Sequence, residues 1–182
     1  MANVNAVPDE QDHYEQLYHL HYPRVVRLCR LLLADPYEAE DVAQEVFIKL
    51  LRALQTETRA IAWVPWLTRV TVNACRDRRR SGWWRWRRVR RHTDDPDAPL
   101  LPDRPSYGPT PEEEALSRET RGRIWQAFRE LPSRQQEVFV LRYLEGWSTD
   151  AVADALGLSA GTVKQHLFRA VHRLRAVLGG EA

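Results

Sequence analysis

Three groups of polar side chains recur at helical spacing and could bind other macromolecules. An acidic group with one glutamine lies within residues 35–47, a basic group with one asparagine lies within 69–80, and a third group within 160–172 combines glutamine, arginine and an aromatic residue. Arginine neutralises phosphates, whereas asparagine, glutamine and arginine pair with the edges of bases. These residue types indicate binding to polymers rather than bond-making chemistry.

The basic group forms a stripe along a predicted helix from Val64 to Arg80. Arg69, Asn73, Arg76 and Arg80 follow one another at spacings of four, three and four residues, which places them along one side of a helix. A plain solvated helix face rarely carries such a set without acids. The stripe therefore favours contacts with a phosphate backbone, with Asn73 offering a donor and an acceptor to a base.

A predicted loop, residues 55–62, precedes this helix and contains Thr58 and Arg59. Trp63 and Trp66 flank its end. Aromatic faces beside a basic groove are surfaces on which unpaired bases stack. Tryptophan at helical spacing is more often a core residue, so one of the two is expected to be buried.

The acidic group lies on a helix predicted to begin at Asp35-Pro36, because an aspartate cap followed by proline is typical of a helix start. Asp41, Gln44 and Glu45 fall on the polar side of this helix. They could be a solvated face or a docking surface for a basic helix. The apolar side is predicted to face the core and consists of Val42, Ala43, Val46, Phe47, Leu50, Leu51 and Leu54.

The C-terminal part predicts a helix-turn-helix. Ser133 and Gln136 have the spacing of a capping box, and Ser148 is a candidate cap for a short helix. The turn 157–159 then leads into a longer helix that Ser159 caps and that ends near Leu178. The side chains of this helix predicted to face inward are Val163, Leu167, Ala170, Val171, Leu174 and Leu178. In this arrangement the second helix enters the major groove of DNA. A plain helical bundle with an incidental turn is the alternative.

The residues on the outer face of the last helix match that role. Glutamine and arginine pair with adenine and guanine, and an aromatic ring can touch the methyl group of thymine. An exposed phenylalanine is otherwise unfavourable on a soluble helix. The candidate DNA-reading residues are Thr162, Lys164, Gln165, Phe168 and Arg169.

The chain has 182 residues and a formal net charge of only +2, but its charges are strongly segregated. Residues 76–92 hold nine arginines against one aspartate, and residues 93–114 hold seven acids against one arginine together with six prolines. A proline-rich acidic stretch with little apolar content predicts an extended, flexible linker. We therefore predict an all-α protein with two small domains, residues 10–92 and 112–182, joined by a linker over 93–111.

Several classes of protein are not indicated. No apolar run approaches the roughly 20 residues that span a bilayer, and the N-terminus lacks the pattern of a signal peptide. The two cysteines, Cys29 and Cys75, have no partner at metal-ligand spacing. These features predict a cytoplasmic protein without a cofactor or a bound metal and without membrane insertion.

Three segments together resemble a bacterial sigma factor of the extracytoplasmic-function class, in the sigma-70 family. The segment DPYEAEDVAQEVF at 35–47 is similar to region 2.2 of that family, and WLTRVTVNACRDRRR at 66–80 is similar to regions 2.3 and 2.4. Residues 131–174 resemble region 4. The three motifs occur in the order typical of the family.

The resemblance implies a non-enzymatic factor that binds core RNA polymerase, recognises promoter DNA and helps to open it. Asp41, Gln44 and Glu45 would then face the clamp helices of the polymerase, and the C-terminal domain would meet its flap. The residues assigned to the −10 element are Thr58, Arg59, Trp63, Arg69, Asn73, Arg76, Arg79 and Arg80. Thr162, Lys164, Gln165, Phe168 and Arg169 are assigned to the −35 element. An anti-sigma factor is a further candidate partner.

Two alternatives remain at this point. The segment GTVKQHL at 161–167 also resembles the recognition helix of LuxR-type transcriptional regulators, although no strands of a receiver domain are predicted upstream. A helical metal-dependent nuclease could use Asp35, Glu38, Asp41 and Glu45 as metal ligands. The cluster Trp83-Trp84-Arg85-Trp86 has no assigned role.

Overall fold

The computed structural model describes residues 10–33, 35–56, 60–81 and 111–179, and the side chains of 10, 111–118 and 178 are not described. Every element in this part of the chain is helical, as the all-α prediction requires. Contacts between residues divide the chain into two compact units, Met1–Thr93 and Asp94–Ala182. The predicted linker and the tryptophan cluster at 83–86 lie outside the described residues.

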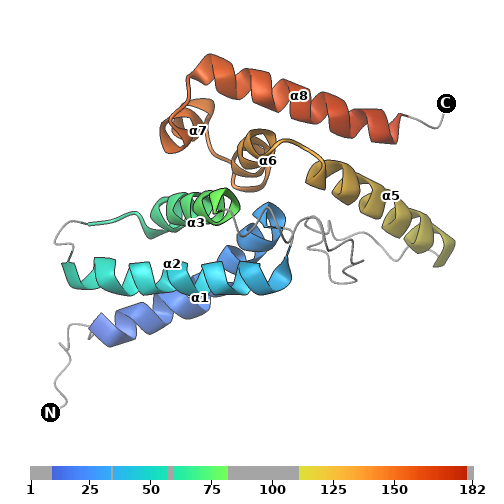
Figure 1. Ribbon diagram of the computed structural model, residues 1–182. Helices are drawn as coiled ribbons and strands as arrows, with labels where there is room; N and C mark the ends of the chain where they lie inside the picture. Colours follow the sequence, from blue (N-terminus) through green and yellow to red (C-terminus); the bar gives the residue numbers. More distant parts are fainter. Residues whose placement is uncertain (1–9, 34, 57–59, 82–110, 180–182) are drawn as a thin grey trace, which may run out of the picture. The chain divides into compact units, whose positions relative to one another are not determined.

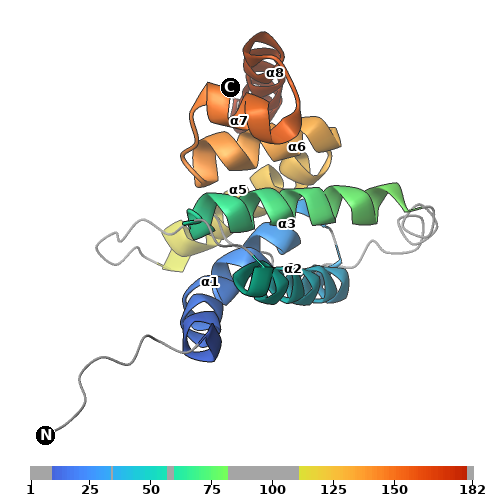
Figure 2. The same cartoon turned by 90° about the vertical axis from the view of Figure 1, so that its left-hand side faces the viewer.

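The first unit contains α1 (Glu10–Leu32), α2 (Pro36–Thr56) and α3 (Trp63–Arg80), and each helix contacts the other two (Figures 1 and 2). The predicted start of α2 is confirmed, because the Asp35 carboxylate accepts hydrogen bonds from the backbone N–H of Tyr37 at 3.0 Å and of Glu38 at 3.4 Å. From this start, α2 buries Val46, Phe47 and Leu50 along its inner side. Leu51, which we predicted to be in the core, is exposed instead.

The core of this unit combines aliphatic and aromatic side chains. Val25, Leu28, Val46 and Leu67 are fully buried. Phe47 packs edge-on against Tyr18 with ring centroids 4.9 Å apart, and Tyr18 stacks on Tyr22 at 4.8 Å. These contacts fix α2 on α1 and determine which side of α2 faces outwards.

The two thiols of this core come from different helices. Cys29 of α1 and Cys75 of α3 are both buried and not joined by a disulfide. A hydrogen bond with Cys75 and burial raise the pKa of the Cys29 thiol well above its ordinary value. The thiolate, which is the reactive form, is therefore strongly disfavoured.

We expect neither thiol to react with a small aromatic disulfide reagent while the protein is folded. Burial blocks access to both sulfur atoms, and the raised pKa of Cys29 suppresses its thiolate. Two thiols per chain should become reactive when denaturant is added. Rapid release of the chromogenic thiol without denaturant would contradict this packing of α1 on α3.

The second unit contains α5 (Pro111–Arg129), α6 (Ser133–Phe139), the π-helical turn η1 (Val140–Leu144), α7 (Thr149–Leu156) and α8 (Ala160–Leu178). Within this unit α8 packs against α5, α6 and α7 (Figure 2). Its buried side chains include Val163, Ala170 and Leu174, as the periodicity predicted. The helix-turn-helix therefore consists of α7, the turn 157–159 and α8.

Two of the three predicted caps in this unit are confirmed and one is wrong. The Ser148 hydroxyl accepts a hydrogen bond from the Ala151 N–H, and the Ser159 hydroxyl accepts one from the Thr162 N–H, each at 3.1 Å. Gln136 forms no capping box with Ser133. Its amide instead donates to the backbone carbonyls of residues 128 and 129 at 3.0 and 3.1 Å. Gln136 is buried there and bonds carbonyls in the last turn of α5, because a buried amide needs hydrogen-bond partners.

Candidate polymerase and DNA interfaces

The outer face of α2 carries the residues predicted to bind a partner protein. Asp41, Gln44 and Glu45 are all exposed. Asp41 and Gln44 lie opposite the buried residues of α2, whereas Glu45 lies at the edge of the exposed side, in line with the buried Glu38. Ile48 lies one turn further along this face and is 51% exposed. An isolated apolar residue in a polar helix face was the signal for it in the sequence, and we did not assign it. We call these four residues the α2 face.

The start of α3 presents a small aromatic group. Trp63 and Trp66 meet edge to face with centroids 5.8 Å apart, and His13 of α1 contacts Trp63 at 6.1 Å. The expectation that one tryptophan is buried is wrong, because both are half-buried. Each tryptophan therefore keeps part of its surface open to solvent. Thr58 and Arg59 lie outside the described residues.

The predicted basic stripe is present on α3. Arg69, Asn73 and Arg80 are exposed, and Arg76 is half-buried. The Arg76 guanidinium donates to the Asn73 side-chain oxygen at 3.3 Å, so it orients that amide. Arg79, which we also assigned to DNA, is half-buried. We call Arg69, Asn73, Arg76 and Arg80 the α3 stripe.

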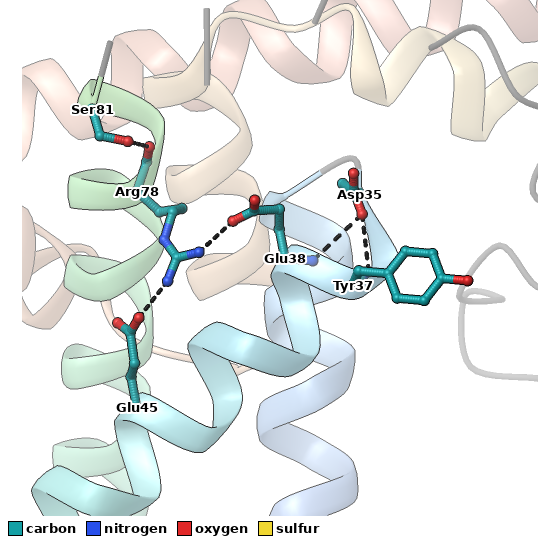
Figure 3. Close-up of polar contacts among 6 residues, drawn as sticks. All are labelled: Asp35, Tyr37, Glu38, Glu45, Arg78 and Ser81. Atoms are coloured by element: carbon teal, nitrogen blue, oxygen red, sulfur yellow. Dashed lines mark hydrogen bonds and ion pairs between the residues drawn. The ribbon is translucent and has the colours of Figure 1, made fainter. Parts of the chain in front are cut away.

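Arg78 of α3 lies outside this stripe and points towards α2. Its guanidinium forms ion pairs with Glu38 and Glu45, as Figure 3 shows. Burial lowers the pKa of Arg78, but the hydrogen bonds and charges of the two carboxylates outweigh burial and raise that pKa above its ordinary value. The guanidinium therefore stays charged between the two helices.

The same contacts argue against a metal-dependent nuclease. Asp35 caps α2, and Glu38 is buried against Arg78, so these carboxylates are engaged in the fold. Within the described ranges, no group of three or more histidine, cysteine, aspartate or glutamate side chains could hold a metal ion.

No described helix combines the length and the apolar character that crossing a bilayer requires.

The outer face of α8 holds the third group. Lys164, Gln165 and Arg169 are exposed, and Phe168 is 71% exposed. Thr162 is half-buried, and its hydroxyl lies 2.8 Å from that of Ser159 at the start of the helix. All five predicted residues thus belong to one helix, and four of them are exposed.

A shallow groove of about 430 Å³ runs beside these residues. Phe168 and His172 belong to its lining, and their ring centroids are 6.1 Å apart. Gln135 of α6 joins them, and Arg169 and Arg173 add positive charge. Nearby, burial together with Arg169 and Arg134 lowers the pKa of His166, which keeps this imidazole neutral at physiological pH. His166 therefore adds no positive charge to this surface.

Comparison with family models identifies both units. Residues 17–85 match the model described as Sigma-70 region 2, and residues 121–174 match Sigma-70, region 4. The first match includes α2 and α3 with their exposed groups. The second includes the helix-turn-helix.

Full-length relatives agree with this result. The chain is 32% identical over 166 residues to the RNA polymerase sigma-E factor of Streptomyces coelicolor, covering 91% of this chain and 85% of the relative. It is 31% identical over 166 residues to the ECF RNA polymerase sigma factor SigM of Mycobacterium tuberculosis, covering 91% of this chain and 77% of the relative.

Solved structures share the fold at lower identity. The sigma factor RpoE of Bartonella quintana, determined with the anti-sigma factor NepR, is similar with a TM-score of 0.65 and 19% identity over 93% of this chain and 99% of that one. CnrH, determined with the cytosolic domain of CnrY, gives a TM-score of 0.62 and 23% identity over 94% of this chain and 91% of that one. With both regions matched in order and relatives aligned over most of their length, the chain belongs to the sigma-70 family and is an RNA polymerase sigma factor of the extracytoplasmic-function group.

Proposed function

We propose that the three exposed groups divide the work of transcription initiation. The α2 face binds the clamp helices of core RNA polymerase, and the α3 stripe with the aromatic pair Trp63 and Trp66 meets the −10 element. The outer face of α8 reads the −35 element. The observation that carries this assignment is Phe168, which is 71% exposed on a helix whose other large apolar side chains, as far as the structure describes them, are buried or half-buried.

The chemistry of each group supports its role. The α2 face carries two carboxylates and one apolar residue, which suits a basic helix with an apolar contact at its centre. The α3 stripe carries three arginines, which neutralise phosphates, and one oriented asparagine amide, which can pair with a base. The α8 face follows the geometry of a recognition helix, with Gln165 and Arg169 available to base edges.

The remaining parts of the proposal follow from the family. The protein acts by binding rather than by catalysis, and it works in the cytoplasm, where polymerase and chromosome are found. The C-terminal unit contacts the polymerase flap. An anti-sigma factor is a candidate partner, because RpoE of Bartonella quintana was determined in complex with one.

Purified protein added to core polymerase with a library of genomic promoters tests the proposal. The expected result is transcription that starts at a defined subset of promoters and that requires this factor. Core binding without any programmed initiation would overturn the assignment of the DNA-reading groups. Failure to bind core at all would overturn the assignment of the α2 face.

Two substitutions should distinguish recognition of the DNA bases from attraction to the DNA phosphate backbone. Gln165→Ala in holoenzyme is expected to cost about 1 to 3 kcal/mol at one position of the −35 element and to relax the base preference there. Arg80→Ala is expected to weaken binding evenly across promoters and to lower the slope of log affinity against log salt by about 1. Promoter binding measured over a salt series, with every base at each −35 position, checks both. An even loss for Gln165→Ala would contradict its role in reading.

A further inference from the structure

The ion-pair cluster of Glu38, Glu45 and Arg78 connects the inside of the first unit to its surface (Figure 3). Glu38 and Glu45 are seven residues apart on α2, so they lie two turns apart on the same side of that helix. Arg78 comes from the last turn of α3 and contacts both. The Glu38 side chain is 3% exposed, whereas the Glu45 side chain is 48% exposed. One end of the cluster is therefore part of the core, and the other belongs to the α2 face.

The Arg78 guanidinium uses a different nitrogen for each of the two carboxylates. Its Nη1 donates to Oε2 of Glu38, and its Nη2 donates to Oε1 of Glu45. The planar fork of arginine fixes the directions of these two donors relative to one another. Because burial immobilises Glu38, the donor that reaches Glu45 has a defined position. The Glu45 carboxylate is thereby held at the surface while nearly half of its side chain remains open to a partner.

We propose that Arg78 is a positioning residue for polymerase binding, which holds Glu45 in the orientation that the clamp helices meet. This proposal rests on the proposed role of the α2 face. An exposed glutamate samples several rotamers, and a partner that binds it must immobilise it. Arg78 makes this ordering part of folding rather than of binding. Although it belongs to the basic run of α3, Arg78 then serves the protein interface and not the DNA.

The expected consequence is a measurable coupling between Arg78 and Glu45. Removing the guanidinium returns the Glu45 side chain to its rotamers, which should weaken core binding about threefold to tenfold, the value of one ordered side chain. Once Glu45 is neutralised, Arg78 has no carboxylate to orient for the polymerase. The effects of the two substitutions should therefore not multiply.

The test is a double-mutant cycle on the full chain, with equilibrium binding of each labelled variant to core polymerase. Glu45→Gln and Arg78→Gln should each weaken binding, and the double variant should bind about as well as Glu45→Gln alone. Arg30→Gln is the matched control, because Arg30 pairs with Glu40 of α2 at 3.2 Å outside the α2 face. It should leave core affinity unchanged.

A second variant distinguishes a loss of binding from a loss of folded protein. Arg78→Lys keeps a positive charge near Glu38 but lacks the fork that reaches both acids, so it should remain folded and lose the same coupling. A purely structural role for Arg78 would lower the melting temperature of both variants without changing the affinity of the folded protein for core polymerase. That result, or multiplying effects in the cycle, would overturn the proposal.

The outcomes also separate this proposal from the one on which it rests. If Glu45→Gln leaves core binding unchanged, the role of Glu45 in the α2 face is wrong, and the role of Arg78 falls with it. If Glu45→Gln weakens binding and Arg78→Gln does not, only the role of Arg78 is wrong.

Discussion

Combining Asp41→Lys with Ile48→Ala is expected to lower the affinity for core RNA polymerase by at least about a hundredfold. A lysine among residues that we propose to meet a basic helix places like charges together, which costs several kcal/mol at an interface. Ile48 is the one large apolar residue of the α2 face, and truncating a central anchor costs about 2 kcal/mol or more. Each 1.4 kcal/mol is a factor of about ten in affinity, so the two effects together exceed the stated loss.

Equilibrium binding of the labelled full chain to core polymerase measures this loss. The chain supplies a matched control on α1, where Asp12 is exposed and Leu20 is an exposed large apolar residue. Asp12→Lys with Leu20→Ala makes the same changes of charge and size away from the α2 face. The control should bind core polymerase normally, and both proteins should keep their helical content. Equal losses for the two double variants would show that net charge, rather than the α2 face, governs binding.

The features that could be predicted from sequence are those set by residues close together in the chain. Asp35, Ser148 and Ser159 each cap the helix that follows them, because the hydroxyl or carboxylate and its N–H partners lie within three residues. The inward side chains of α8 follow from periodicity for the same reason. These local rules were sufficient to place α8 and its outer face.

The features that could not be predicted depend on partners distant in sequence. Gln136 has the spacing of a capping box, but the carbonyls at the end of α5 lie close to it only after the chain folds. Arg78 looked like one more basic residue until α2 brought Glu38 and Glu45, 40 and 33 residues away, to its guanidinium. Ile48 was visible as an apolar residue on the polar side of α2, yet its exposure had to be seen before it could be assigned.

The candidate site likewise has features that could be predicted from sequence and features that could not. Which residues of α2, α3 and α8 point outwards follows from helical period and from the buried residues opposite them. The helical period does not show which of these outward side chains is held in place by a neighbour. Arg76 holds the Asn73 amide, and Arg78 holds the Glu45 carboxylate. Orientation of side chains, rather than their presence, is what the structure adds to the sequence motifs.

Phe47→Ala is expected to destabilise the first unit by about 3 to 5 kcal/mol, the cost of emptying a large buried site. Phe47 is 1% exposed and packs on Tyr18 and Tyr22 of α1, so its loss opens the α1–α2 contact. A small domain has only about 5 to 15 kcal/mol of stability in total. Hydrogen exchange should therefore accelerate throughout α1, α2 and α3. If the predicted domain division is right, exchange in α6, α7 and α8 should stay unchanged, since each unit then opens separately.

Phe168→Ala is the matched control for this result, because it removes the same ring from a position that is 71% exposed. Its effect on stability should stay within about 0.5 kcal/mol, as for most surface substitutions. The same variant should weaken binding of holoenzyme to the −35 element, since the ring is assigned to DNA rather than to the core. Accelerated exchange in both units of Phe47→Ala would show instead that the chain unfolds as one cooperative body. In that case, losses of promoter binding caused by core substitutions in α1 to α3 could not be assigned to the −10 interface alone.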